Sequence, residues 1–198
     1  YYYPKLIPTQ SFVDLFDDSD FRKSIYIKKL FANYASTKYE NIYLVYKYPD
    51  NDVLKNSTRD DPTYLHRPKV FRIAEIYLIA AEAAYKNGDQ TNAKTYLDRL
   101  RTARGIGSVT YTDLWTEIQN ERNRELAFEG FRMADIKRWN LGVVRGTPQN
   151  LSAIVSDPAD QYYQLNIPAG NYKMTWPIPP SDIRYEQGRA NWQQNPGW

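Results

Sequence analysis

The chain has 198 residues, of which 42% are hydrophobic and 25% are charged, and its formal net charge is +3. These values are ordinary for a folded protein, and the length suits one domain or part of a larger domain. The basic residues are spread along the sequence, so the concentrated basic surface of a nucleic-acid-binding protein is not expected. Cysteine is absent, which excludes disulfides, a thiol nucleophile and cysteine-based metal sites.

The beginning of the sequence suggests a piece of a longer protein. No signal peptide is visible, and the longest apolar stretch, 76–85, contains Glu82 and is too short to span a membrane. The chain opens with three consecutive tyrosines and Pro4, an unusual natural start. We therefore expect a fragment or a processed piece.

Residues 1–66 are expected to form an irregular region with a two-stranded arm. Ser11 can cap a short first helix. The segments 21–30 and 39–48 are rich in Tyr, Ile and Val, which predicts two strands. Residues 49–63 are dense in turn-forming residues and predict an exposed loop.

Residues 67–140 are expected to form a helical core. A helix with Pro68 in its first turn is apolar on almost every face, which predicts a fully buried helix. Asp89 can cap a second helix that stops at Gly105. The pair resembles one tetratricopeptide-like unit, which cannot bury its faces alone. It needs the 113–129 helix on one side and upstream helices, absent from this sequence, on the other.

The 113–129 helix has an unusual pattern of charge. Five of its residues follow one another at spacings of four, three, four and three, which places them on one face of the helix. They are Leu114, Ile118, Glu121, Glu125 and Phe128. Carboxylates on an apolar face need cationic partners, and arginine binds them bidentately. Gly130 can end this helix, and a short second helix follows.

We therefore predict a structural network of ion pairs that joins the last long helix to the tail. Its expected members come from three parts of the helical core: Arg72, Glu75, Glu82, Glu121, Arg122, Glu125, Glu129, Arg132, Asp135 and Arg138. If Glu125 and Arg132 form a buried pair, removal of either side chain should cost about 3–5 kcal/mol.

A catalytic role is not expected. Glu121 and Glu125 have the spacing of a retaining glycosidase pair, but neighbouring arginines should lower their pKa values and remove the general acid. His66 is the only histidine and has no catalytic partner nearby in sequence. Four loop aspartates offer oxygen ligands for calcium without EF-hand spacing, and a solvated acidic loop is the favoured interpretation: Asp50, Asp52, Asp60 and Asp61. No metal or cofactor is expected.

Residues 141–198 predict a loop-rich tail that packs on the helical core, with the whole chain forming one structural domain. Glycine and proline recur between 142 and 170, with one short strand around 162–167. Trp139 and Trp176 are expected to be buried.

Three stretches resemble the SusD/RagB family. The first reads E-R-N-R-E-L-A-F-E-G-F-R-M-A-D-I-K-R-W over 121–139, with Asn123 in place of the usual second arginine and Phe131 where histidine is frequent. The second is the R-x-A-E-x-Y-L-x-x-A-E-A pattern that begins at Arg72. The third is the ending, P-I-P-P-S-D-I followed by Q-N-P-G-W. The resemblance is strong over 70–198 and weak before it.

This resemblance implies a mainly α fold, with tetratricopeptide-like helices and a less regular α+β and loop region, in a C-terminal fragment of a larger protein. It also implies an outer-membrane, lipid-anchored protein of the cell surface that captures an oligosaccharide and delivers it to a SusC-like TonB-dependent transporter. The lipid-bearing cysteine and the N-terminal repeats are not in this sequence. Two alternatives are a binder of peptide- or glycoprotein-derived nutrients, as in RagB, and a helical-repeat scaffold for protein interactions.

Aromatic side chains outside the helical core are the candidates for ligand contact. Flat rings stack on the C–H faces of sugars while polar side chains bond the hydroxyls. The candidates are Tyr1, Tyr2, Tyr3, Tyr43, Tyr46, Tyr48, Tyr162 and Tyr163. The alternative is that most of these rings pack within the strands or against other parts of the protein.

Overall fold

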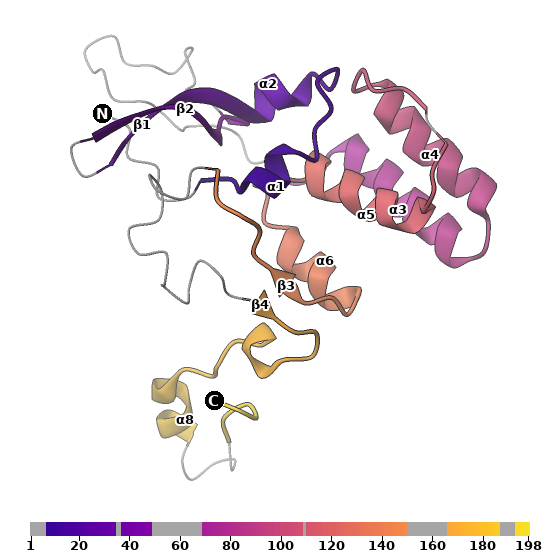
Figure 1. Ribbon diagram of the computed structural model, residues 1–198. Helices are drawn as coiled ribbons and strands as arrows, with labels where there is room; N and C mark the ends of the chain where they lie inside the picture. Colours follow the sequence, from indigo (N-terminus) through magenta and orange to yellow (C-terminus); the bar gives the residue numbers. More distant parts are fainter. Residues whose placement is uncertain (1–6, 35–36, 49–68, 109, 150–165, 187–192) are drawn as a thin grey trace. The chain divides into compact units, whose positions relative to one another are not determined.

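The computed structural model describes residues 7–34, 37–48, 69–108, 110–149, 166–186 and 193–198. The described chain is mainly helical, with short strands (Figure 1). It divides into two compact units. Unit 1 comprises Tyr1–Phe131 with Gly146–Pro158, and unit 2 comprises Arg132–Arg145 with Ala159–Trp198.

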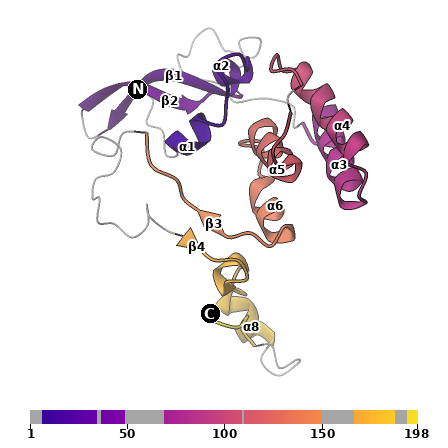
Figure 2. The same ribbon diagram turned by 45° about the vertical axis from the view of Figure 1, so that its right-hand side comes forward.

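Three helices form the centre of unit 1: α3 (Ile73–Lys86), α4 (Gln90–Thr102) and α5 (Leu114–Glu125). They lie side by side in Figure 2. Aspartates cap two of them, as their positions suggest, because Asp89 accepts a hydrogen bond from the backbone N–H of Asn92 and Asp113 caps α5. The helical fold expected from the sequence is confirmed.

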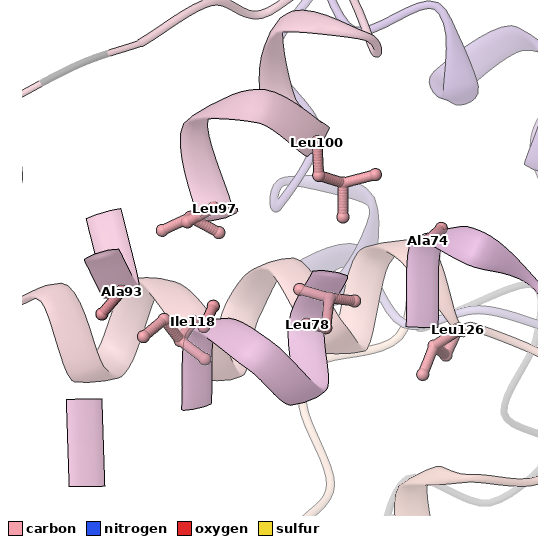
Figure 3. Packing of buried hydrophobic residues seen from close by; sticks show 8 residues of the cluster. Ala74, Leu78, Ala93, Leu97, Leu100, Ile118 and Leu126 are labelled. Carbon is pink, nitrogen blue, oxygen red and sulfur yellow. The ribbon is translucent and has the colours of Figure 1, made fainter. Parts of the chain in front are cut away.

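Small and branched side chains from all three helices fill the space between them. Figure 3 shows Leu78 of α3, Leu97 of α4 and Ile118 of α5 in one apolar cluster. Each of these three side chains is fully buried. Alanines at 74, 81 and 93 complete the cluster and let the helix backbones approach closely.

One face of α3 remains exposed, and the expectation of a helix buried all round is wrong for that face. Ala74, Leu78 and Ala81 point into the cluster and are buried. Ile73, Ile76 and Ile79, which lie on the other side, are 71%, 50% and 49% exposed. The reason is that α4 and α5 cover only one side of α3 within the described chain.

The N-terminal part of unit 1 holds α1 (Gln10–Val13), α2 (Arg22–Tyr26), β1 (Ile27–Tyr34) and β2 (Thr37–Val45). The strands pair antiparallel with an irregularity between Leu30 and Ala32 (Figure 1). Thr9, not Ser11, caps α1.

The first strand begins six residues later than expected because a helical turn, α2, occupies the start of its predicted segment. The carboxylate of Asp20 accepts the backbone N–H of Arg22 and thereby favours that turn.

Unit 2 is built from short elements: α6 (Arg132–Arg138), β3 (Val143–Val144), β4 (Asn166–Ile167), a 3-10 turn η1 (Tyr172–Met174) and α8 (Pro180–Glu186). The two short strands pair antiparallel. Gly142 permits this approach, since a Cβ there would lie 2.5 Å from the carbonyl oxygen of Ile167. No helix in the described part of the chain has the length and apolarity needed to cross a membrane.

Candidate functional site

The carboxylates of α5 are the most unusual feature of unit 1, because they are buried inside the protein. Glu121 and Glu125 are both 0% exposed. They lie on the same helix as Ile118, which contacts the apolar cluster of α3 and α4. A buried carboxylate is stable only when cations and hydrogen-bond donors surround it.

Glu125 is held by three guanidinium groups from three different parts of the chain. Arg104, which follows α4, donates from Nε and Nη2 to the two carboxylate oxygens over 2.9 and 3.0 Å. Arg72, which precedes α3, donates from Nη1 over 2.7 Å. Arg22 of α2 donates from Nη1 over 2.8 Å. Glu125 therefore ties three helices and the N-terminal segment to one point.

Glu121, one turn earlier, shares Arg22 with Glu125 and also binds Arg124. Nη1 of Arg22 lies 2.6 Å from Oε1, and Nη2 of Arg124 lies 2.7 Å from Oε2. The Nε and Nη2 groups of Arg22 also bond both carboxylate oxygens of Asp20. Arg22 is completely buried, so its charge is neutralised entirely by carboxylates of the protein.

Lys47 stabilises the C-terminal end of α5. Its Nζ donates to the carbonyl oxygens of Glu125 and Ala127 over 2.6 and 3.1 Å, and it lies 2.5 Å from a carboxylate oxygen of Glu129. Arg72 also bonds Glu129. The last carbonyls of a helix lack partners within the helix, so a buried ammonium there satisfies them and complements the helix dipole.

The electrostatics follow from this geometry. Burial alone would raise the pKa of Glu125, but hydrogen bonds from Arg104 and Arg72 outweigh it and lower the pKa to about 2. Burial lowers the pKa of Lys47 to about 8, against the opposing effect of Glu129. The pKa of Tyr26 is raised by burial and by Glu125, to which its hydroxyl donates.

These values argue against a glycosidase pair. A glycosidase needs one carboxyl group that keeps its proton near neutral pH, which requires a raised pKa. The pKa of Glu125 moves the other way, and guanidinium groups occupy both of its oxygens. The carboxylates of α5 therefore act as structural anchors.

The predicted network members are distributed as follows. Arg122 of α5 faces Glu75 of α3 at 3.6 Å, and Asp135 pairs with Arg138 at 3.0 Å within α6. Glu82 is half-buried on α3. Arg132 at the start of α6 is exposed.

Six further charged residues belong to the network and were missed by sequence reasoning: Asp20, Arg22, Lys47, Arg101, Arg104 and Glu117. Arg101 lies 2.5 Å from Glu117, which Arg124 also contacts. In α5, carboxylates within an apolar stripe indicated buried charges that need cationic partners. Arg22 and Lys47 lie in strand-like segments where no comparable pattern marks them.

Three of the predicted ligand residues are described. Tyr43, Tyr46 and Tyr48 are half-buried, and lysine ammonium groups lie over each ring at 5.4, 4.7 and 5.3 Å. Outside the described residues lie Tyr1, Tyr2, Tyr3, Tyr162 and Tyr163, together with His66 and the four loop aspartates. The described residues contain no group of three or more histidine, aspartate or glutamate side chains suited to a metal ion.

The two tryptophans expected in the core differ. Trp139 is half-buried, and the guanidinium of Arg138 lies 4.4 Å from its ring centre. Trp176 is 86% exposed, so the expectation of a buried side chain is wrong there. The side-chain amide of Asn195 bonds its backbone carbonyl oxygen.

Comparison with known proteins identifies the family. A SusD family model matches residues 17–198. The SusD-like protein P2 of Formosa agariphila is 36% identical over 109 residues, which are 49% of this chain and 22% of that protein. A SusD superfamily protein from Bacteroides vulgatus superposes with a TM-score of 0.69 at 25% identity, over 97% of this chain and 39% of the other.

A second solved structure is described as a SusD-like carbohydrate binding protein, also from Bacteroides vulgatus. It is 32% identical, with a TM-score of 0.53 over 69% of this chain and 28% of its own. The chain thus spans well under half the length of these relatives. Because the family model covers nearly the whole sequence, this chain belongs to the SusD family.

Proposed function

We propose that this chain is part of a cell-surface protein that binds a nutrient glycan and delivers it to a SusC-like TonB-dependent outer-membrane transporter. The observation that carries the proposal is family membership over residues 17–198. A relative described as carbohydrate binding, 32% identical over 69% of the chain, supports a sugar over another nutrient.

The proposed mechanism is capture and hand-off without bond chemistry. The most enzyme-like residues, Glu121 and Glu125, are buried and engaged by arginines, so a substrate has no access to them, and the lowered pKa of Glu125 leaves that carboxylate without a proton to donate. A binding protein needs only a rigid frame that presents a ligand surface. The ion-pair network supplies rigidity to that frame.

Additional helices and a cellular location also belong to the proposal. The exposed isoleucine face of α3 suits packing against additional helices, such as those that the greater length of the relatives provides. The localisation follows the family: the outer membrane at the cell surface, through a lipid anchor outside this sequence.

A glycan array tests this function. The chain and the longer protein that contains it should bind at least one oligosaccharide saturably, in isothermal titration calorimetry with maltoheptaose, cellohexaose or xylohexaose or with the strongest array hit. Binding of peptides with no binding of glycans would replace this proposal with the peptide-nutrient alternative. Binding of proteins alone would favour the scaffold.

A further inference from the structure

The exposed aromatic side chains of the two units differ in chemistry. In the described part of unit 1, the exposed rings are all phenylalanines: Phe21, Phe31, Phe71 and Phe128. In the described part of unit 2, they are tyrosines and tryptophans: Tyr172, Trp176, Tyr185 and Trp198. Phenylalanine offers only a hydrocarbon surface, whereas tyrosine and tryptophan combine a flat face with a polar atom. The second composition suits a ligand that is itself partly polar.

Three of the four residues in unit 2 are linked, two by contact of their rings and the third through the neighbouring backbone. The indole N–H of Trp198 donates to the carbonyl oxygen of Thr175 over 3.0 Å, which places that ring beside the residue that precedes Trp176. The rings of Tyr172 and Trp198 meet edge to face, with centroids 5.3 Å apart. We call Tyr172, Trp176 and Trp198 the C-terminal aromatic patch.

The backbone of the patch is fixed on both sides of Trp176. The side-chain amide of Asn195 donates to the carbonyl oxygen of Trp176 over 2.7 Å. The amide of Gln194 accepts from the N–H of Ile178 and donates to its carbonyl, over 2.7 and 2.8 Å. A surface that is already ordered loses less entropy when a ligand binds.

Gly197 brings the end of the chain against Tyr172. Its φ is +93°, and a Cβ at this position would lie 2.6 Å from the Tyr172 ring. A glycine is therefore required here for two reasons, its backbone conformation and its close approach to the ring. The same approach holds Trp198 against Tyr172 and keeps the patch together.

The accessible chemistry of the patch is that of ring faces. Trp176 is 86% exposed, and Trp198 is half exposed with its N–H already bonded within the chain. A sugar ring carries C–H groups on its faces and hydroxyls around its rim, so it can stack on such rings. Exposed Lys173 and Thr175 beside the patch can bond the hydroxyls.

We propose that the C-terminal aromatic patch is a stacking site for the sugar rings of an oligosaccharide, with Trp176 as its principal platform. This inference rests on the proposed function and adds the residues that contact the glycan. It also differs from the tyrosines expected from the sequence, of which the described ones are half-buried.

The test compares three variants of the full chain: Trp176→Ala, Trp176→Tyr and Tyr185→Ala. Tyr185 is the matched control, because it is 78% exposed in the same unit but lies outside the hydrogen-bonded patch. Calorimetry uses maltoheptaose, cellohexaose, xylohexaose and the strongest glycan-array hit. Trp176→Ala should weaken binding at least about tenfold, Trp176→Tyr should retain most of it, and Tyr185→Ala should leave it unchanged.

A second measurement does not depend on substitution. A saturating glycan should protect Trp176 of the wild-type chain from oxidation by N-bromosuccinimide, with the oxidised residue located by mass spectrometry. Glycan binding that is unaffected in Trp176→Ala, without protection of Trp176, would overturn the patch as the site and leave the proposed function intact. Absence of binding to any glycan by the wild-type chain and by the longer protein would overturn both.

Discussion

Helix α5 contributes to two cores of opposite chemistry. Towards α3 and α4 it presents Ile118, which packs in a cluster of leucines and alanines. Elsewhere it presents Glu121 and Glu125, which lie equally deep but among arginines. An apolar core tolerates the loss of a methyl group at moderate cost, whereas a buried charge without its partner keeps its full desolvation penalty. Substitutions in the two cores should therefore lower the free energy of unfolding by different amounts.

The largest expected effect comes from Arg22→Met. This variant keeps much of the side-chain volume but leaves Asp20, Glu121 and Glu125 short of a buried cation, so we expect a loss of about 3–5 kcal/mol in the free energy of unfolding. Urea denaturation measures it.

The matched change in the apolar core is Ile118→Val, for which we expect about 1 kcal/mol. Equal costs for the two variants would contradict the distinction between the cores.

Acid should also reduce the stability that the charged core contributes. The pKa of Glu125 is about 2 in the folded protein against an ordinary value of 4.5, so its contribution is complete above pH 4.5 and disappears as the pH falls towards 2. The shift corresponds to about 3 kcal/mol. Unfolding measured between pH 5 and 2 gives the total loss, and the ¹³C resonance of the Glu125 carboxyl gives its own titration. A titration midpoint near pH 4.5 for that resonance would contradict the lowered pKa of Glu125.

The smallest effect is expected on the exposed face of α3. Ile76→Gln should change the stability of this chain by less than about 0.5 kcal/mol, because the side chain is half exposed. In the longer protein the same substitution should cost more if helices cover that face. Thermal melting of both forms, with and without the substitution, makes the comparison, and an equal effect in both would contradict the packing proposed for α3.

The sequence predicted the helices well because their signals are local. Asp89 and Asp113 cap helices within three residues, and Gly88 and Gly105, both with positive φ, follow the ends of α3 and α4. It also indicated that Glu121 and Glu125 are buried. Their partners were harder to predict from the sequence, since Arg22 lies 99 and 103 residues away from the two carboxylates. No periodicity links positions that far apart.

The exposed surfaces were the least predictable features. Trp176 was expected inside because tryptophan is a large apolar residue, but its side chain is exposed. The apolar α3 was expected to be covered on all sides, yet the described chain supplies neighbours for one side only. Hydrophobicity shows that a residue can be buried, and the surrounding elements determine whether it is.

The bonds of Arg22 have a consequence for how the protein is made. Arg22 is synthesised 99 residues before Glu121, and at ~5–20 residues per second the delay is on the order of 5–20 s. During that time Asp20, two residues away, is the carboxylate that can already neutralise it. Helix α5 then emerges with two carboxylates that can be buried only once the N-terminal segment has folded back onto it. The charged core therefore makes completion of unit 1 depend on contact between α2 and α5, two segments that are synthesised seconds apart.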